Sequence, residues 1–430
     1  MSLDGSLAFD ACSGGGCDCT AKGLAPTSVH GTIYDPAGLT PLYNIFVYVP
    51  ATTPAPIVAG SPTCSQCQAK ATGSPIVSAS TDAKGEFTLA GIPAGDGVPL
   101  VIQAGKWRRQ VVLPHMNACQ ANEVKDPATL RLPKNGTEGD LPLIAFTTGG
   151  ADFAECFLRG VGIDDSEFTT PSGTGHVHLY PGNGPSGLGG GAVAPGNTLT
   201  PLDTYSFWAD SKNLLKYDIV FNSCEGSDYD RGPAAYGAMK QYLDGGGRLF
   251  ATHYFYNWFA PPNGPSDFQS VAAWSPDPTA TSAPYAGFFI DTSFPKGKAF
   301  ADWLQNVGAT TTYGAIGLVD TRADVGAVTS KATRWIYNAD SPGSSTSATS
   351  YLSFNTPVTQ PTTQQCGRAV FSDVHVAGGL APFGAQTFPK ECGGLPPAYA
   401  KNQTALEFLF FDLSSCVQDD TKPPPPPPPN

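Results

Sequence analysis

The sequence carries little charge, and positive charge is the scarcer kind. Only 14% of its 430 residues are charged, and 24 Lys plus Arg stand against 36 Asp plus Glu, so the net charge is −12. A protein that binds nucleic acid needs a basic face to meet the phosphates, and no basic run of that kind is visible. We therefore expect no nucleic-acid partner.

Long apolar runs are missing as well. No stretch reaches the roughly 18 apolar residues that span a membrane, and Met1–Ala11 lacks the basic start and apolar centre of a signal peptide. The composition still favours export, because 49 Gly and 41 Pro make a loop-rich chain and 11 Cys are typical of disulfides in an oxidising compartment. We predict a secreted or cell-surface protein whose signal peptide is not present in this sequence.

The stretch Tyr217–Phe259 has the clearest pattern of secondary structure. Asp218–Ser223 is an apolar run of strand length, a helical spacing of apolar residues follows, and Gly245–Gly247 ends that helix. Leu249–Tyr256 then reads as a second strand. A strand–helix–strand unit makes a parallel sheet, and such sheets bind ligands beyond the carboxyl ends of their strands.

The segment 29–133 differs, because it contains short strands and no helical spacing. Alternation is clear in Glu86–Leu89 and Leu100–Val112, and Asp35–Gly38 has the composition of a turn. This pattern predicts a small antiparallel β-sandwich.

Two phrases in this segment, GTIYDPAG and TDAKGEFTLAGIPAG, resemble the carboxypeptidase regulatory-like, transthyretin-related sandwich over Val29–Pro114. The resemblance implies a structural or binding accessory without catalytic residues. The insertion Ala51–Ser78 departs from the family pattern and contains Cys64 and Cys67. For these two we expect disulfides to Cys119 or to the cysteines of the leader.

The phrases YDIVFNSCEG, GGRLFATH and GRAVFSDVH, within Leu141–Val417, resemble the ThuA-like branch of the class I glutamine amidotransferase-like fold. Amidotransferases have a nucleophilic Cys after the strand that here reads RLFAT, whereas this chain has His253. His375 matches a later His of the family, but no paired Glu follows it. The resemblance thus implies the fold without amidotransferase chemistry. Taken together, the two modules, the cysteine-rich leader and the proline-rich tail resemble uncharacterised secreted proteins of myxobacterium-like bacteria.

The predicted fold is multidomain, with an N-terminal antiparallel β-sandwich and a C-terminal α/β doubly wound domain of the flavodoxin or amidotransferase type. The expected divisions are a Cys/Gly-rich leader (1–28), the sandwich (29–133), a linker (134–140), the α/β domain (141–417) and a proline-rich tail (418–430).

Cys224 follows a strand end and has two interpretations. Its thiol could act as a nucleophile if a histidine lowered its pKa. It could instead form a disulfide with Cys156, which follows the first strand at the same edge of the sheet. We expect the disulfide.

Histidines are the other candidate site residues. His253 and His375 end neighbouring strands and should approach each other, and a loop containing His176 and His178 could fold over them. Together they could hold zinc or calcium, with a carboxylate from Glu225, Asp228 or Asp373. The candidate ligand-binding residues are His253, His375, Glu225, Asp373, Asn257 and Trp258. His253 is expected on the rim of the crevice, and the aromatic run Tyr254–Phe259 could stack on sugar rings.

Two classes of function follow from these patterns. The first is an exported structural or ligand-binding protein whose partner is a carbohydrate or another cell-envelope component, with self-association as a further possibility. The alternative is a metal-dependent hydrolase or sugar-processing enzyme that uses the histidine cluster. The residues alone do not decide whether the protein is an enzyme.

Overall fold

The computed structural model describes residues 19–67, 71–182, 191–276, 287–338, 348–378, 386–394 and 396–424. The chain forms two compact units. The first contains residues 1–58, 67–141 and 424–430, and the second contains residues 59–66 and 142–423. Residues 1–18 include Cys12 and Cys17 of the expected leader, and these lie outside the described residues.

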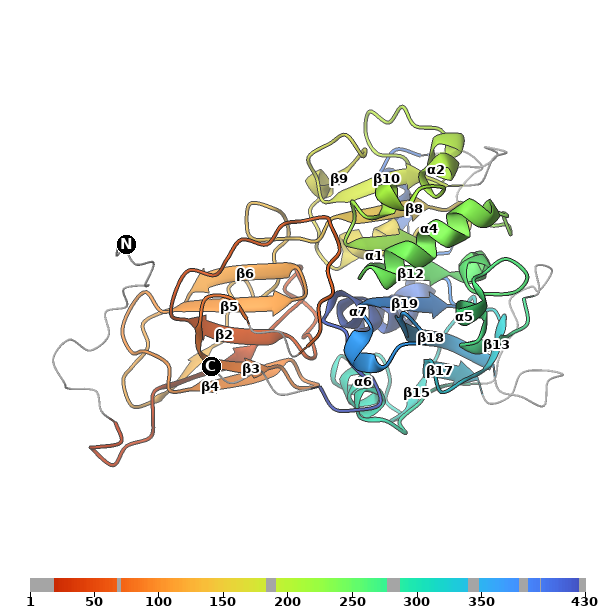
Figure 1. The fold of residues 1–430 in the computed structure, drawn as a ribbon. Coiled ribbons are helices and arrows are strands. Elements are labelled where there is room, and N and C mark those ends of the chain that lie inside the picture. The colour runs from red at the N-terminus through yellow and green to blue at the C-terminus, as the bar shows by residue number, and fades with distance from the viewer. Residues whose placement is uncertain are drawn as a thin grey trace. The chain divides into compact units, whose positions relative to one another are not determined.

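The first unit is built from two small sheets (Figure 1). Its strands are β1 (Ser28–Thr32), β2 (Phe46–Pro50), β3 (Pro75–Ser80), β4 (Glu86–Ala90), β5 (Pro99–Ala104), β6 (Trp107–Val112) and β7 (Ala121–Val124). One sheet has the order β3-β2-β5-β6 and the other β4-β1-β7. This organisation is consistent with the expected β-sandwich. It is not wholly antiparallel, because β7 pairs with β1 in parallel.

A buried carboxylate organises the turn after β1. Asp35 is 2% exposed and accepts hydrogen bonds from the backbone N–H groups of Leu39 (2.8 Å) and Thr40 (3.2 Å). Burial outweighs these bonds and raises the pKa of Asp35 to about 6. The carboxyl of Asp35 ionises at a lower pH in the unfolded chain than in the folded one. The folded protein therefore loses stability at this residue as the pH rises from about 4 to 6.

Asp35→Asn should remove this pH dependence. The difference in free energy of unfolding between the variant and the original protein should be about 2–3 kcal/mol larger at pH 7 than at pH 4, since the amide does not ionise. Urea denaturation of both proteins at the two pH values measures the difference. A difference that stays constant with pH would contradict the assignment.

The second unit contains a ten-stranded sheet with the order β15-β14-β17-β18-β19-β12-β11-β8-β10-β9 (Figure 1). The strands from β19 to β9 are parallel, and those from β15 to β18 are antiparallel. Their bounds are β8 Ile144–Thr148, β9 Phe168–Thr169, β10 Val177–Pro181, β11 Ile219–Asn222, β12 Arg248–Thr252, β14 Phe288–Ile290, β15 Ala315–Ile316, β17 Thr333–Asn338, β18 Ala348–Thr356 and β19 Gly367–Ser372. A separate ribbon pairs β13 (Ala272–Trp274) with β16 (Val325–Val328).

Helices pack on both faces of the parallel strands, because successive strand residues point to opposite faces. On one face, Val220 joins a buried cluster with Met239 and Tyr242 of α4. On the other face, Phe221 contacts Phe250 of β12 and Phe410 of α7. The helices are α1 Glu155–Gly160, α2 Pro201–Phe207, α3 Ser211–Leu214, α4 Gly232–Asp244, α5 Ser266–Gln269, α6 Pro295–Asn306 and α7 Ala400–Ser414, with short 3-10 turns that include η3 His253–Trp258, η5 Lys390–Gly394 and η6 Pro397–Tyr399.

The disulfides differ from the expected pairs. Cys156 bonds to Cys392, and Cys224 is a free, buried thiol, so the predicted 156–224 bond is wrong. Cys156 packs beside Phe153 and Ala377, while the sulfur of Cys224 points toward a histidine described below.

Two further disulfides each join cysteines of the same unit. Cys119 bonds to Cys19 and Cys64 bonds to Cys366, so Cys64 does not join Cys119 or the leader; Cys67 and Cys416 are also disulfide-bonded. Disulfides at this density indicate folding in an oxidising environment.

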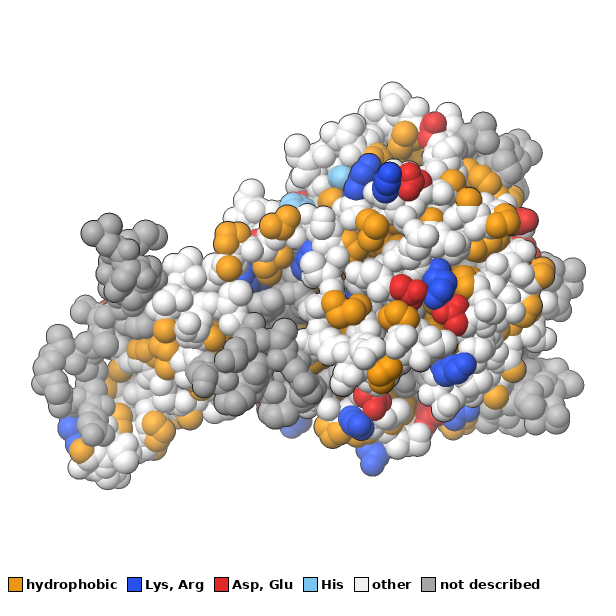
Figure 2. All heavy atoms as spheres, viewed as in Figure 1, with side chains coloured by type: hydrophobic (Ala, Val, Ile, Leu, Met, Phe, Trp, Pro, Cys, Tyr) orange, Lys and Arg blue, Asp and Glu red, His pale blue; other side chains and the backbone are white. Residues whose placement is uncertain are grey.

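The distribution of charge on the surface and the hydropathy of the helices can be described directly. On the face drawn in Figure 2, Lys and Arg side chains are scattered and several lie beside acidic ones. Within the described residues, no helix has both the length and the hydropathy needed to cross a membrane.

Candidate functional site

Two neighbouring strand ends bring His253 and His375 together. β12 and β19 pair in parallel, with Thr252 opposite Ser372. His253 follows β12 directly, and its Nδ1 lies 3.2 Å from Nε2 of His375. The predicted approach of the two rings is confirmed.

Cys224 is the third member of this cluster. It follows β11, the strand on the other side of β12, and its Sγ lies 3.3 Å from Nδ1 of His253. The sulfur and the two ring nitrogens all lie within 4.8 Å of one another. The exposed fractions of Cys224, His253 and His375 are 0%, 2% and 3%, so His253 is buried and the expectation of a rim residue is wrong.

An unusual backbone conformation aims the ring of His253. Its φ is +40°, a region that costs a non-glycine residue roughly 1–3 kcal/mol. The strand ends at Thr252, and the chain turns at once into η3, which directs the His253 ring toward Cys224 and His375. Strain of this kind often marks a functional position.

Each histidine presents its outer nitrogen to a carboxylate. Nδ1 of His375 lies 2.9 Å from Oδ2 of Asp320, and Nε2 of His253 lies 3.8 Å from Oδ2 of Asp324. Asp320 also accepts hydrogen bonds from the Tyr399 hydroxyl (3.0 Å) and from Nη1 of Arg322 (2.8 Å). These carboxylates fix which ring nitrogen faces the cluster.

The two rings have opposite electrostatic surroundings. Burial and the charge of His375 lower the pKa of His253 to about 2, so this ring is neutral. Burial opposes protonation of His375 too, but Cys224 and Asp320 outweigh it and hold the pKa of His375 well above its ordinary value. His375 can therefore donate from Nε2 to the neutral ring of His253.

Further acidic groups position the turn after β19. Asp152 accepts the backbone N–H groups of Val376 (3.0 Å) and Ala377 (2.8 Å) just beyond His375. Asp373, a predicted ligand, is fully buried and accepts the backbone N–H of Asp324 at 2.8 Å. Burial raises the pKa of Asp373 well above its usual range, which makes it a poor anionic ligand.

His176 and His178 lie away from the cluster. The segment predicted as a loop is strand β10, in which His178 pairs with Ala145 near the amino end of β8, whereas the cluster lies beyond the carboxyl ends. Nδ1 of His178 contacts the Tyr217 hydroxyl (2.9 Å), and Nδ1 of His176 contacts Glu167 (2.6 Å). The prediction that all four histidines converge is wrong for these two.

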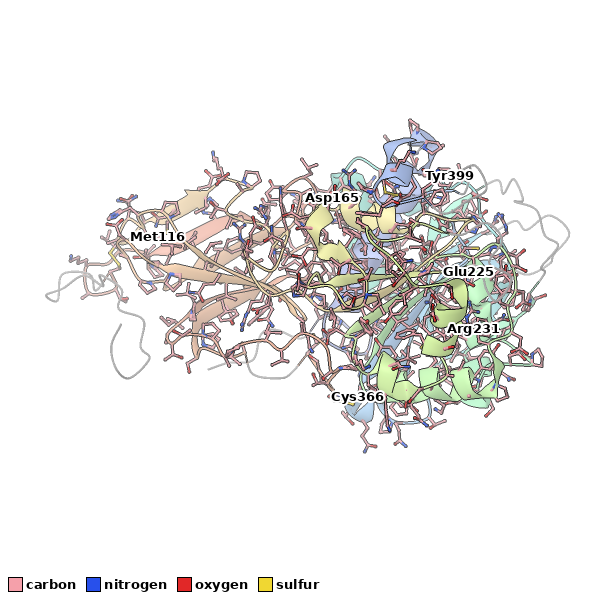
Figure 3. All side chains as sticks on the ribbon, turned by 90° about the horizontal axis from the view of Figure 1, so that it is seen from above. Met116, Asp165, Glu225, Arg231, Cys366 and Tyr399 are labelled. Atoms are coloured by element: carbon pink, nitrogen blue, oxygen red, sulfur yellow. A yellow bond between two sulfur atoms is a disulfide. The ribbon has the colours of Figure 1, made fainter. Side chains whose placement is uncertain are left out.

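The remaining predicted residues are occupied by other contacts. Glu225 forms a buried ion pair with Arg231 at 2.8 Å (Figure 3). Asn257 donates to Asp228, so that carboxylate is engaged as well. Trp258 is 1% exposed and, like most of the aromatic run from Tyr254 to Phe259, packs in the core. The expected sugar-stacking surface is therefore not formed by this run.

The three donors of the cluster fit a soft divalent metal. A tetrahedral zinc ion with bonds of about 2.0–2.3 Å holds neighbouring ligand atoms about 3.3–3.6 Å apart. The distances from Nδ1 of His253 to Sγ of Cys224 (3.3 Å) and to Nε2 of His375 (3.2 Å) are close to this spacing. Calcium, the other predicted metal, prefers oxygen ligands and does not suit a sulfur–nitrogen set.

Sequence reasoning missed three carboxylates of this site: Asp152, Asp320 and Asp324. Asp320 and Asp324 belong to a loop between β15 and β16, where no strand-end pattern marks them. Asp320 also has a positive φ of +50°, which a non-glycine residue does not reveal in sequence.

No family model matches the chain, and no curated protein matches it. A cytoplasmic protein from Salmonella typhimurium is 9% identical, with 64% of this chain and 99% of that chain covered and a TM-score of 0.29. A type II cohesin–X-dockerin complex from Acetivibrio cellulolyticus is 17% identical, with 34% and 75% covered and a TM-score of 0.17. Both TM-scores are below 0.5, and we infer neither fold nor function from them.

Proposed function

We propose that this is an exported, disulfide-stabilised protein whose second unit binds one zinc ion, or a similar soft divalent metal, through Cys224, His253 and His375. The observation that carries the proposal is the convergence of one sulfur and two nitrogens within 4.8 Å in a buried site. We assign the first unit to the carboxypeptidase regulatory-like sandwiches and the second to the ThuA-like α/β domains.

Hydrogen bonding supports a metal at this point. Among the described residues, the buried Nε2 of His253 has no hydrogen-bond partner, and Oδ2 of Asp324 lies 3.8 Å away. Metal binding at Nδ1 fixes the proton on Nε2, where the carboxylate attracts it. Nδ1 of His375 already contacts Asp320, as the outer nitrogen of a zinc-bound histidine does in most proteins.

The burial of the cluster favours binding over turnover. Three protein ligands leave a zinc ion a fourth position, which is the arrangement of catalytic sites. A substrate would, however, have to reach groups that are at most 3% exposed. We therefore propose a binding or structural role at the cell surface, with a carbohydrate or another cell-envelope component as the partner, and keep the metal-dependent hydrolase as the alternative.

One observation supports a second candidate. Cys224 is free, and it lies beside His375, which Asp320 orients. A thiol, an imidazole and a carboxylate in this order can perform nucleophilic catalysis. The sulfur of Cys224 cannot both bind zinc and act as a nucleophile. The zinc content of the protein therefore distinguishes the two candidate functions.

The full chain, equilibrated with zinc and freed of excess by gel filtration, should contain about one zinc per chain by elemental analysis. The variants Cys224→Ser and His375→Gln should each lose most of the bound zinc, because each removes one of the three protein ligands. Asp320→Asn should retain binding with about 10–100-fold weaker affinity, since it only orients His375.

His115→Gln is the matched control, because His115 is an exposed histidine of the first unit and should leave the zinc content unchanged. A folded protein that takes up no zinc, or a Cys224→Ser variant that binds as much as the original, would contradict the proposal. Rapid alkylation of Cys224 in zinc-free protein would then favour the nucleophile.

A further inference from the structure

The disulfide Cys156–Cys392 has unusual surroundings, because each of its cysteines directly follows a glutamate in the chain. Oε1 of Glu391 lies 3.8 Å from Sγ of Cys392. One carboxylate oxygen of Glu391 is within 4.8 Å of both sulfurs. A carboxyl group thus lies directly beside the sulfur–sulfur bond.

Within the part of the chain that the structure describes, three of the four oxygens of Glu155 and Glu391 are buried without a hydrogen-bond donor. Glu155 is fully buried, and neither of its oxygens has a hydrogen-bond partner among the described residues; the same holds for the buried Oε2 of Glu391. Oε1 of Glu391 faces a sulfur that carries no hydrogen in the oxidised form. Buried acceptors without donors raise the free energy of the oxidised protein.

The same burial favours the protonated form of each carboxyl group. Burial raises the pKa of Glu155 well above its ordinary value, and the neighbouring charge of Glu391 raises it further. Burial also raises the pKa of Glu391. Each group is therefore a better proton donor near neutral pH than an exposed glutamate.

We propose that Cys156–Cys392 is a redox-active disulfide, which exchanges with external dithiols while the folded protein keeps its other disulfides. Reduction creates two thiols, and the one at Cys392 can donate to Oε1 of Glu391. The reduced form is thus stabilised relative to the oxidised form, which is the property of an easily reduced disulfide.

The exchange proceeds in two balanced steps. A thiolate of the external dithiol attacks Sγ of Cys392, which is the less buried of the two cysteines, and the electron pair of the broken bond leaves on Sγ of Cys156. That sulfur takes a proton from the Glu391 carboxyl, which regains one from solvent. The second thiolate of the reagent then attacks the mixed disulfide, which releases Cys392 and leaves the reagent oxidised.

Reduction of Cys156–Cys392 would also affect the metal-binding cluster proposed above. Cys392 belongs to η5, and the chain continues through η6 to Tyr399, whose hydroxyl contacts Asp320. Opening the disulfide frees this segment from α1 and weakens the support of Asp320 for His375. The exchange itself requires no metal, so it can be tested independently of zinc.

The test equilibrates the folded, zinc-free chain in dithiothreitol buffers with stepwise ratios of reduced to oxidised reagent. Acid quenching, alkylation and peptide mass spectrometry then give the reduced fraction of each disulfide. Cys156–Cys392 should be half-reduced at a ratio at least tenfold lower than Cys19–Cys119 and Cys64–Cys366. Glu391→Met should raise that ratio by about tenfold, because the oxygen that accepts from the Cys392 thiol is lost.

Glu86→Met is the matched control, since Glu86 is exposed on β4 in the first unit, and it should leave the ratio unchanged. Circular dichroism at each ratio establishes that the chain stays folded. Reduction of all disulfides together, or no change in Glu391→Met, would overturn the proposal.

Discussion

Replacing Arg368 with Met should lower the free energy of unfolding by about 3–5 kcal/mol. Arg368 is fully buried near the start of β19, and its guanidinium binds Asp412 (2.5 Å) and Asp420 (2.6 Å). Lys296, also fully buried, contacts the same two carboxylates. Removing one cation leaves two buried carboxylates with a single positive partner, and that unbalanced charge is the source of the cost.

Arg334→Met is the matched control for this experiment. Arg334 also pairs with an aspartate, Asp291, but its side chain is 28% exposed, so its loss should cost no more than about 1 kcal/mol. Urea denaturation compares both variants with the original protein. Equal denaturation midpoints for Arg368→Met and Arg334→Met would show that the buried ion pairs do not contribute the expected free energy to stability.

The second large effect concerns the disulfide Cys19–Cys119, which closes a loop of 100 residues in the first unit. Replacing both cysteines with Ser should cost that unit about 2–5 kcal/mol, because the unfolded chain regains the conformational freedom of a long loop. For a unit of this size the melting temperature should fall by about 10 °C or more.

Calorimetry of the double variant measures this fall in the transition of the first unit. Cys64→Ser with Cys366→Ser is the control, since that bond lies in the second unit and should leave the first transition in place. A shift below about 2 °C in the Cys19/Cys119 variant would contradict the assignment.

The sequence was sufficient to place two of the three donors of the cluster. Asp218–Ser223 and Leu249–Tyr256 have the length and composition of strands, and the glycines between them end a helix, so a parallel pair follows. The phrase GRAVFSDVH contains a later strand that is followed by His375, and the rule that ligands gather beyond the carboxyl ends of parallel strands then brings His253 and His375 together. This part of the prediction depends on local patterns and one general rule of topology.

The strand containing His178 was missed because its surroundings are rich in glycine. Val177–Pro181 is a short apolar run inside a long irregular segment, and its partner β8 lies about thirty residues earlier in the chain. Sheet pairing with β8 and β9 overrides the loop-like composition around it. The two histidines consequently belong to a strand and not to a cover over the site.

Disulfides and ion pairs between residues far apart in the chain could not be predicted from a single sequence. The partner of Cys156 is 236 residues away, so no local spacing identifies it. Asp420 was assigned to the proline-rich tail, yet it is 5% exposed and bound to Arg368. In both cases the tertiary contact, and not the composition of the segment, decides the structure.

Cobalt substitution tests the central claim most directly. Co(II) replaces zinc at tetrahedral sites, and a bound thiolate gives it an intense charge-transfer absorption that nitrogen and oxygen ligands do not produce. The cobalt-loaded full chain should show this band together with tetrahedral visible bands, Cys224→Ser should lose it, and His115→Gln should keep it. A spectrum without a thiolate band, or one unchanged in Cys224→Ser, would contradict a metal centre at Cys224, His253 and His375.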